Sequence, residues 1–195
     1  GRGGEEALAL SDAGIPFEII PGITSAIAVP AYAGIPLTHR DVACSAAIIT
    51  GHRAQWVENP ELDWQKCSLA GDSLVFLMGV KNLPRLVEQL LAAGRSSDTP
   101  VALIERGTTA NQKTVTGTLD DIVQRAAEIR PPAVIVVGEV VRVRDQLHWF
   151  DEIEHRALFG LRVLNTKSVP RRSESRLVRV LPPLDEFDSQ ILALG

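Results

Sequence analysis

Short apolar runs alternate with longer amphipathic stretches along the 195-residue chain. Four runs, three of them ending at glycine, span residues 44–51, 73–79, 100–107 and 133–141. Continuous apolar runs of this length are typical of strands buried on both faces of a sheet. Residues 82–94 and 118–129 instead carry apolar side chains at helical spacing, and we expect Gly94 to end the first helix and Thr118 to cap the second. The alternation predicts an α/β fold.

A different composition marks residues 108–119, between two of these units. The segment is rich in threonine and valine and contains Gly117, which favours a strand with a turn over a helix. We therefore expect a hairpin arm, and a sheet that is mixed rather than purely parallel.

The first residues combine a glycine-rich turn with a helical pattern. Glu5 and Glu6 fall in the first turn of the predicted helix, where acidic side chains suit the helix dipole, and Gly14 is expected to end it. Phe17–Ile20 then predicts a strand. A helix that begins on a glycine-rich loop normally follows a strand, so we expect the chain to enter in mid-domain, as a fragment would.

Residues 18–41 are apolar enough to be buried, yet three prolines and two glycines break the segment. Thr24 or Ser25 is expected to cap a short helix of small residues that Pro30 kinks or interrupts. Gly34 and Pro36 are expected to end this helix. The segment suits a hinge between two α/β lobes, with free amides and hydroxyls facing a cleft. The alternative is a buried connection whose caps are already satisfied.

Composition narrows the class of protein. The net charge of -4 and the pI near 5.6 argue against a nucleic-acid surface. Cys44 and Cys67 are too few for a disulfide framework and lack metal-ligand spacing, so we interpret them as small core residues in a reducing compartment, by default the cytoplasm. No apolar run is long enough to cross a membrane and no signal-peptide pattern opens the chain.

Specific motifs then indicate a family. The segments are PGITSA at 21–26, GIPLTHR at 34–40, TGH at 50–52, LVFLMGVKNLP at 74–84 and ERGT at 105–108. In one register from Gly1 to about Phe150, the chain resembles the tetrapyrrole methylase family, and within it the uroporphyrinogen-III C-methyltransferases. The resemblance implies two α/β lobes with S-adenosylmethionine in the cleft between them, usually in a homodimer.

The same resemblance divides the chain and implies a reaction. Residues 1–36 would be the end of the first lobe and the hinge, and residues 37–150 the whole second lobe with its mixed sheet. The implied reaction transfers two methyl groups from S-adenosylmethionine to carbon atoms of uroporphyrinogen III, giving precorrin-2 for sirohaem and cobalamin synthesis.

Candidate cofactor contacts follow from the resemblance: Thr24, Ser25, Met78 and Gly107. Hydroxyls and amides suit the polar groups of the cofactor, a thioether suits the adenosyl group, and a glycine lets the backbone approach a ligand. A sulfonium methyl is already electrophilic, so the protein has chiefly to align the reactants and exclude water. We assign no catalytic side chain and no metal ligand.

The macrocycle bears eight carboxylates, so basic residues around the cleft should attract it. We name Arg2, His39 and Arg40 as candidates. His52 is a weaker one, and His148 and His155 lie where nothing indicates a site.

The departures from the family are as informative. The opening strand, the proposed acid/base residues and the GGDPFVF run of the first lobe are absent before residue 1. We therefore expect this chain alone to bind the cofactor weakly and not to turn over.

Residues 151–195 begin with charged positions and contain Pro182-Pro183 and a basic stretch, which is typical of a linker or solvated tail. Within them, LFGLRVLNTK at 158–167 faintly resembles the opening strand of uroporphyrinogen-III synthase. Three hypotheses remain open: a methyltransferase, a bifunctional methyltransferase and synthase truncated at both ends, and a non-catalytic remnant or dimerisation module.

Overall fold

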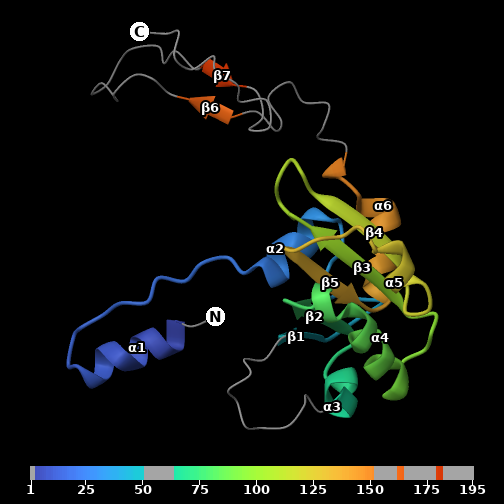
Figure 1. Cartoon of the computed structure of the whole chain (residues 1–195), viewed down its shortest axis with the longest axis horizontal. Helices are drawn as coiled ribbons and strands as arrows, with labels where there is room; N and C mark the ends of the chain where they lie inside the picture. Colours follow the sequence, from blue (N-terminus) through green and yellow to red (C-terminus); the bar gives the residue numbers. More distant parts are fainter. Residues whose placement is uncertain (1–2, 51–63, 152–161, 165–178, 182–195) are drawn as a thin grey trace.

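The computed structural model describes residues 3–50 and 64–151, together with the backbone of two short strands at 162–164 and 179–181. A five-stranded sheet forms its centre, in the order β1-β2-β5-β3-β4 (Figure 1). The strands are β1 (Ala46–Thr50), β2 (Ser73–Leu77), β3 (Pro100–Glu105), β4 (Lys113–Thr118) and β5 (Ala133–Val137). The last of these in sequence therefore lies in the middle of the sheet.

The sheet is mixed, as predicted. β1 and β2 are parallel, whereas β5 is antiparallel to both β2 and β3, and β4 is antiparallel to β3. All four apolar runs do form strands, which confirms those predictions. In the run 133–141 only the first five residues are strand, because the backbone turns at Gly138, whose φ is 139°, and continues as the 3-10 helix η2 (Glu139–Val143).

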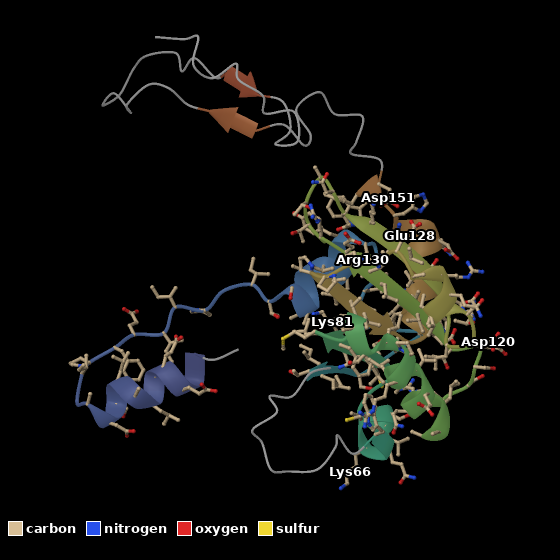
Figure 2. The ribbon with its side chains drawn as sticks, in the orientation of Figure 1. Lys66, Lys81, Asp120, Glu128, Arg130 and Asp151 are labelled. Carbon is tan, nitrogen blue, oxygen red and sulfur yellow. The ribbon has the colours of Figure 1, made fainter. Side chains whose placement is uncertain are left out.

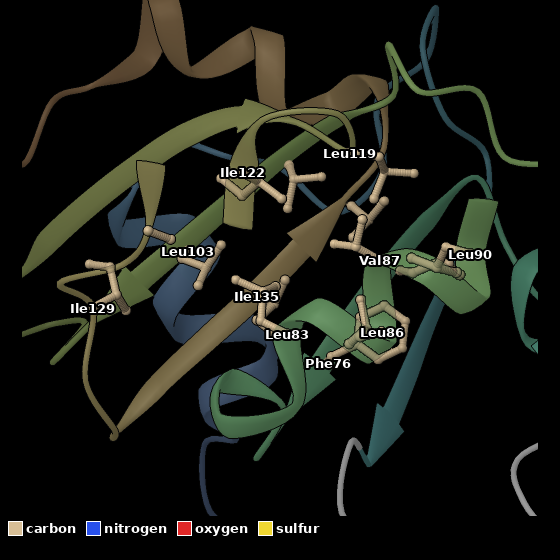
Figure 3. Close-up of a cluster of buried hydrophobic side chains, with 14 of the residues drawn as sticks. Phe76, Leu83, Leu86, Val87, Leu90, Leu103, Leu119, Ile122, Ile129 and Ile135 are labelled. Atoms are coloured by element: carbon tan, nitrogen blue, oxygen red, sulfur yellow. The ribbon is translucent and has the colours of Figure 1, made fainter. Parts of the chain in front are cut away.

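Alternate residues of the strands supply two separate cores. Phe76, Leu103 and Ile135 lie in the first core, which also receives α4 (Leu83–Ala92) and α5 (Ile122–Arg125) (Figure 3). Their neighbours Val75, Ala102 and Val136 point to the other face and pack with α2 (Ser25–Tyr32) in the second core. Since each fully buried side chain of this kind contributes about 1.5–3 kcal/mol, the two faces together dominate the stability of the lobe.

The predicted amphipathic helix at 82–94 is confirmed as α4. Its apolar face buries Leu83, Leu86, Val87 and Leu90. The helix ends before Gly94, which adopts a φ of 93°.

The expected cap on the second helix is wrong. Thr118 is the last residue of β4, where it pairs with Pro100, and α5 begins only at Ile122. The hydrogen bond between these segments also differs from the expected cap. A capping Thr118 would accept through its side chain, whereas here the backbone N–H of Thr118 donates to the Asp121 carboxylate at 2.8 Å. Strand pairing with β3 thus holds Thr118 in extended conformation.

The helix predicted near the start of the chain is confirmed as α1 (Gly3–Asp12), followed by Gly14 with a φ of 66°. The strand predicted at Phe17–Ile20 is wrong. These residues are extended but have no strand partner among the described residues, and Ile19 and Ile20 are 71% and 84% exposed. Figure 1 shows α1 apart from the sheet, at the end of this extended stretch. A strand needs a neighbour to receive its backbone hydrogen bonds, and the described part of the chain supplies none.

The remaining elements are short. They are α3 (Trp64–Leu69), η1 (Val80–Asn82), α6 (Arg144–Leu147) and the antiparallel pair β6 (Arg162–Leu164) and β7 (Arg179–Leu181). Apart from this pair, residues 152–195 lie outside the described residues, and so do the linker and synthase interpretations made for them. Among the helices that the structure describes, none has the length and apolar character that crossing a bilayer requires.

A single carboxylate ties the beginnings of β1 and β2 together. Asp72 Oδ2 accepts from the backbone N–H and the thiol of Cys44, at 2.9 and 3.3 Å, and from the N–H and hydroxyl of Ser45, at 3.1 and 2.9 Å. Cys44 is exposed, so the interpretation of both cysteines as core residues is wrong for this one. The hydrogen bonds from Ser45 and Cys44 lower the pKa of Asp72 from 3.8 to about 2.

We predict that Asp72→Asn lowers the free energy of unfolding at pH 7 and that the difference from the unmodified chain disappears in acid. A carboxyl whose pKa is depressed by folding stabilises the native state above its unfolded pKa, 3.8, and this contribution is lost as the pH falls through about 2. Urea titrations at several pH values measure it. Asp98→Asn, at an exposed position, is the control, and an equal loss for both variants at every pH would contradict the assignment.

Candidate functional site

The carboxyl ends of β1, β2 and β3 meet at one edge of the sheet. β1 is parallel to β2, and β2 and β3 are parallel to each other because both run antiparallel to β5. Met78 directly follows β2, and Gly107 follows β3 after one residue. Only β5 separates the two strands, so their ends are about 10 Å apart. The structure thus places these two predicted cofactor residues at the same edge, which we call the carboxyl edge.

Met78 has an unusual backbone. Its φ of 59° lies in the left-handed region, which residues with a side chain seldom adopt, and the side chain is 63% exposed. An exposed apolar side chain in a strained conformation gains little from packing. Such outliers cluster at ligand-binding sites, which makes Met78 a candidate on structural grounds as well.

The turn that contains Gly107 is strained on both sides of the glycine. Arg106 and Thr108 have φ values of 46° and 70°. Hydrogen bonds hold the turn closed: the N–H of Arg106 donates to the Pro132 carbonyl at 2.9 Å, and the Thr109 hydroxyl donates to the Arg106 carbonyl at 2.7 Å. The turn, called below the 106–108 turn, is therefore fixed by its own neighbours.

Gly107 lies against helix α2. A Cβ on this residue would be 2.9 Å from the Cβ of Val29 and closer still to its methyl groups. Close packing against α2 therefore requires a glycine here, a reason that differs from the ligand approach argued from the sequence. Ser25 lies one helical turn before Val29, so it is about 6 Å along the helix axis from this contact.

Thr24 caps α2, as predicted. Its hydroxyl oxygen accepts from the N–H of Ala26 at 3.2 Å, which leaves the hydroxyl hydrogen available to another acceptor. Ser25 is exposed at the same end. The expected interruption at Pro30 is wrong, because the helix continues to Tyr32. One face of the helix is buried on the sheet, whereas its first residues remain accessible. The hinge between two lobes stays a prediction.

The other end of α2 is held by three side chains. Trp149 Nε1 donates to the Ala31 carbonyl at 3.0 Å, Gln112 Nε2 to the Tyr32 carbonyl at 3.4 Å, and Arg144 Nη1 to the Ala33 carbonyl at 2.6 Å. The Tyr32 ring also packs against Trp149 and Phe150. Carbonyls at a helix C-terminus lack the usual intrahelical partners, and here side chains bond them; the Ala31 carbonyl accepts from the Gly34 N–H as well. Through them α2 is attached firmly to the sheet lobe.

The predicted substrate residues lie elsewhere. His39 and Arg40 help to line a hollow of about 230 Å³ whose wall also includes Cys44. This hollow precedes β1 and therefore lies at the opposite, amino edge, about 16 Å away along the strand. The structure does not bring these two residues together with Met78 and Gly107. Arg2, His52 and His155 lie outside the described residues, and the His148 ring contacts the Arg144 carbonyl near the α2 attachment.

Sequence reasoning missed the cations at the carboxyl edge. Lys81 follows Met78 on η1, Arg106 belongs to the 106–108 turn, and Arg130 precedes β5, so all three lie near this edge; Figure 2 labels Lys81 and Arg130. Arg106 is 4.0 Å from the Glu105 carboxylate, whereas Lys81 has no ion-pair partner within the described ranges. The sequence signal that could have identified these three residues is their position next to predicted strands, at the ends that meet at this edge. No group of three potential metal ligands occurs in the part of the chain that the structure describes.

These elements form an α/β lobe in which two candidate cofactor residues, Met78 and Gly107, lie at the carboxyl edge of a mixed sheet. Comparison with known proteins specifies the family. A profile described as tetrapyrrole (corrin/porphyrin) methylases matches residues 1–123. The match includes more than half of the chain, which therefore belongs to the tetrapyrrole methylase family.

Named relatives agree with this assignment. The chain is 48% identical over 165 residues to siroheme synthase 2 of Aeromonas hydrophila, covering 85% of this chain and 35% of the relative. It is 55% identical over 148 residues to uroporphyrinogen-III C-methyltransferase of Methanocaldococcus jannaschii, covering 74% and 60%. The chain thus spans between a third and three fifths of the length of these relatives.

A solved structure confirms the fold. Uroporphyrin-III C-methyltransferase of Thermus thermophilus, complexed with S-adenosylhomocysteine, superposes with a TM-score of 0.63 at 37% sequence identity. The alignment covers 73% of this chain and 62% of the other.

We predict that Gly107→Ala destabilises the lobe by about 1–3 kcal/mol, because the added methyl group overlaps Val29. Val29→Ala removes the two methyl groups that overlap most and leaves the Cβ contact at 2.9 Å. It should therefore relieve part of the loss, so that the double variant is destabilised by less than the sum of the two single variants. Urea denaturation of the four chains measures the coupling. Additive effects would show that the 106–108 turn is not packed on α2 as described.

Proposed function

We propose that the chain supplies one side of the cofactor site in an enzyme that methylates carbon atoms of uroporphyrinogen III with S-adenosylmethionine, giving precorrin-2. The observation that carries the proposal is that strained Met78 and the 106–108 turn follow strands that end at the same carboxyl edge, and that Gly107 in this turn packs against Val29, one helical turn from the accessible Ser25. Membership of the methylase family and the likeness to a structure complexed with S-adenosylhomocysteine support it.

The chain's residues would divide the work of binding. The Thr24 hydroxyl and the exposed Ser25 offer hydrogen bonds to polar groups, and the Met78 thioether offers a polarizable contact to a purine ring. Bound S-adenosylmethionine would supply an electrophilic methyl group, so no nucleophilic side chain is demanded. The protein's contribution is to orient the two reactants and to exclude water.

Two sets of basic side chains could receive the eight carboxylates of the substrate. Lys81, Arg106 and Arg130 share the carboxyl edge with the proposed cofactor residues. His39 and Arg40 line the hollow at the amino edge. The first set is favoured for the reacting macrocycle because methyl transfer requires substrate and cofactor to be adjacent. The division into residues 1–36 and 37–150, the homodimer and the cytoplasmic location belong to the same proposal.

A second candidate is the same methyltransferase lobe within a larger multifunctional protein. The relative named siroheme synthase 2 favours it, because the chain matches only 35% of that protein. Both candidates require the same cofactor surface.

Isothermal titration of S-adenosylhomocysteine into the chain tests the cofactor site. We expect weak binding, because α1 lies apart from the sheet and buries none of its residues, so this segment adds no contacts to the carboxyl edge. Methyl transfer from labelled S-adenosylmethionine to uroporphyrinogen III tests the reaction. A folded chain that binds no S-adenosylhomocysteine, even at millimolar ligand, would contradict the proposal.

We predict that Met78→Ala weakens this binding about two- to tenfold, since a thioether contact with an aromatic ring is worth about 0.3–1.5 kcal/mol. Stability should change by less than about 0.5 kcal/mol because the side chain is exposed. Leu69→Ala, at a position that is 84% exposed on α3, is the matched control and should leave the affinity unchanged. Equal affinities for both variants would remove Met78 from the site.

A further inference from the structure

Gln112 connects two parts of the proposed cofactor site through one side-chain amide. Its Oε1 accepts from the backbone N–H of Thr108 at 2.8 Å, and its Nε2 donates to the Tyr32 carbonyl at 3.4 Å. The first bond holds the 106–108 turn, and the second reaches the C-terminal end of α2. An amide can make both bonds because it carries an acceptor and a donor on the same planar group.

Among the three side chains that hold the end of α2, Gln112 has a distinct role. The Arg144 guanidinium donates to the Ala33 carbonyl and to the Asp151 carboxylate, and Trp149 donates to Ala31 and packs against Tyr32 and Phe150. Neither bonds to the 106–108 turn. Gln112 alone among these three therefore links the position of α2 to the conformation of the turn.

The turn needs such a link because its backbone is strained. Arg106 and Thr108 both occupy the left-handed region, which is unfavourable for residues with a side chain and persists only where the surroundings impose it. The Thr108 N–H has Gln112 as its partner within the turn. Without that acceptor, Thr108 can relax to an ordinary conformation and carry Gly107 away from Val29.

We propose that Gln112 is a positioning residue: it locks the 106–108 turn onto α2 and thereby sets the cofactor affinity of this edge. The inference rests on the proposed function, because it takes Gly107 to be part of the cofactor site. Gln112 itself need not touch the cofactor. Its effect is transmitted through the backbone of Thr108 and Gly107.

Two substitutions separate the two bonds. Gln112→Met keeps the approximate length of the side chain but removes both bonds. Gln112→Glu keeps an acceptor for the Thr108 N–H, strengthened by its charge, but sets a carboxylate against the Tyr32 carbonyl and so removes the second bond. Asn111→Ala is the matched control, because Asn111 is the exposed neighbour and bonds within the turn through its backbone N–H.

The experiment measures S-adenosylhomocysteine affinity, amide hydrogen exchange of Thr108 and urea stability for the chain and these variants. For Gln112→Met we expect faster Thr108 exchange and roughly five- to tenfold weaker binding, as for the loss of about one hydrogen bond. For Gln112→Glu we expect Thr108 to stay protected while binding weakens by a smaller factor. Asn111→Ala should match the unmodified chain in all three measurements.

Several results would overturn the proposal. Unchanged affinity in folded Gln112→Met would do so, and so would a loss of stability that leaves Thr108 exchange unaltered. A chain that binds no S-adenosylhomocysteine at all contradicts the proposed function and the affinity role with it. In that case the exchange of the Thr108 amide decides the structural part of the proposal. Unchanged exchange in Gln112→Met would refute the link between the turn and α2, whereas faster exchange would support that link.

Discussion

Strand β5 must be buried on both faces and hydrogen-bonded along both edges, and the rest of the lobe is arranged to meet that requirement. Its residues alternate between the two cores, with Ile135 and Val137 in one and Val134 and Val136 in the other. β2 and β3 satisfy its backbone on either side. Because both neighbours run antiparallel to β5, they run parallel to each other, and the residues that follow them meet at one edge. The position of Met78 and Gly107 at one edge therefore follows from the way in which β2 and β3 supply the backbone hydrogen bonds of β5.

Helix α2 covers one side of that strand and is fixed at two places. Gly107 admits Val29 at the carboxyl edge, and the donors Gln112, Arg144 and Trp149 hold the last carbonyls of the helix. Because these contacts attach α2 to the sheet, its first residues can remain exposed while the helix keeps its position. Accessible groups on a firmly attached element are the arrangement that the proposed cofactor site requires.

The sequence was a good guide wherever local pattern determines structure. The four apolar runs became strands and residues 82–94 became α4, because burial and helical spacing are local properties. The sequence was a poor guide where the structure of a segment depends on residues far away along the chain. Phe17–Ile20 has the composition of a strand, but no strand lies beside it among the described residues. Thr118 belongs to β4, where it pairs with Pro100 of β3, and not to the following helix. Met78 and Gly107 were identified by resemblance alone. The left-handed backbone at Met78 and the bond from Thr108 to Gln112 depend on tertiary packing, which no spacing rule predicts.

The order of the strands also determines when the lobe can form during synthesis. β1 and β2, and likewise β3 and β4, can pair as soon as they are made, but the edges of β2 and β3 that will face β5 stay unpaired until β5 is made. Open edges of apolar strands invite pairing with other chains. The match to the family profile ends at residue 123, before β5 begins at Ala133. A polypeptide cut at that boundary would contain both pairs and lack the strand that joins them, so it should aggregate rather than fold.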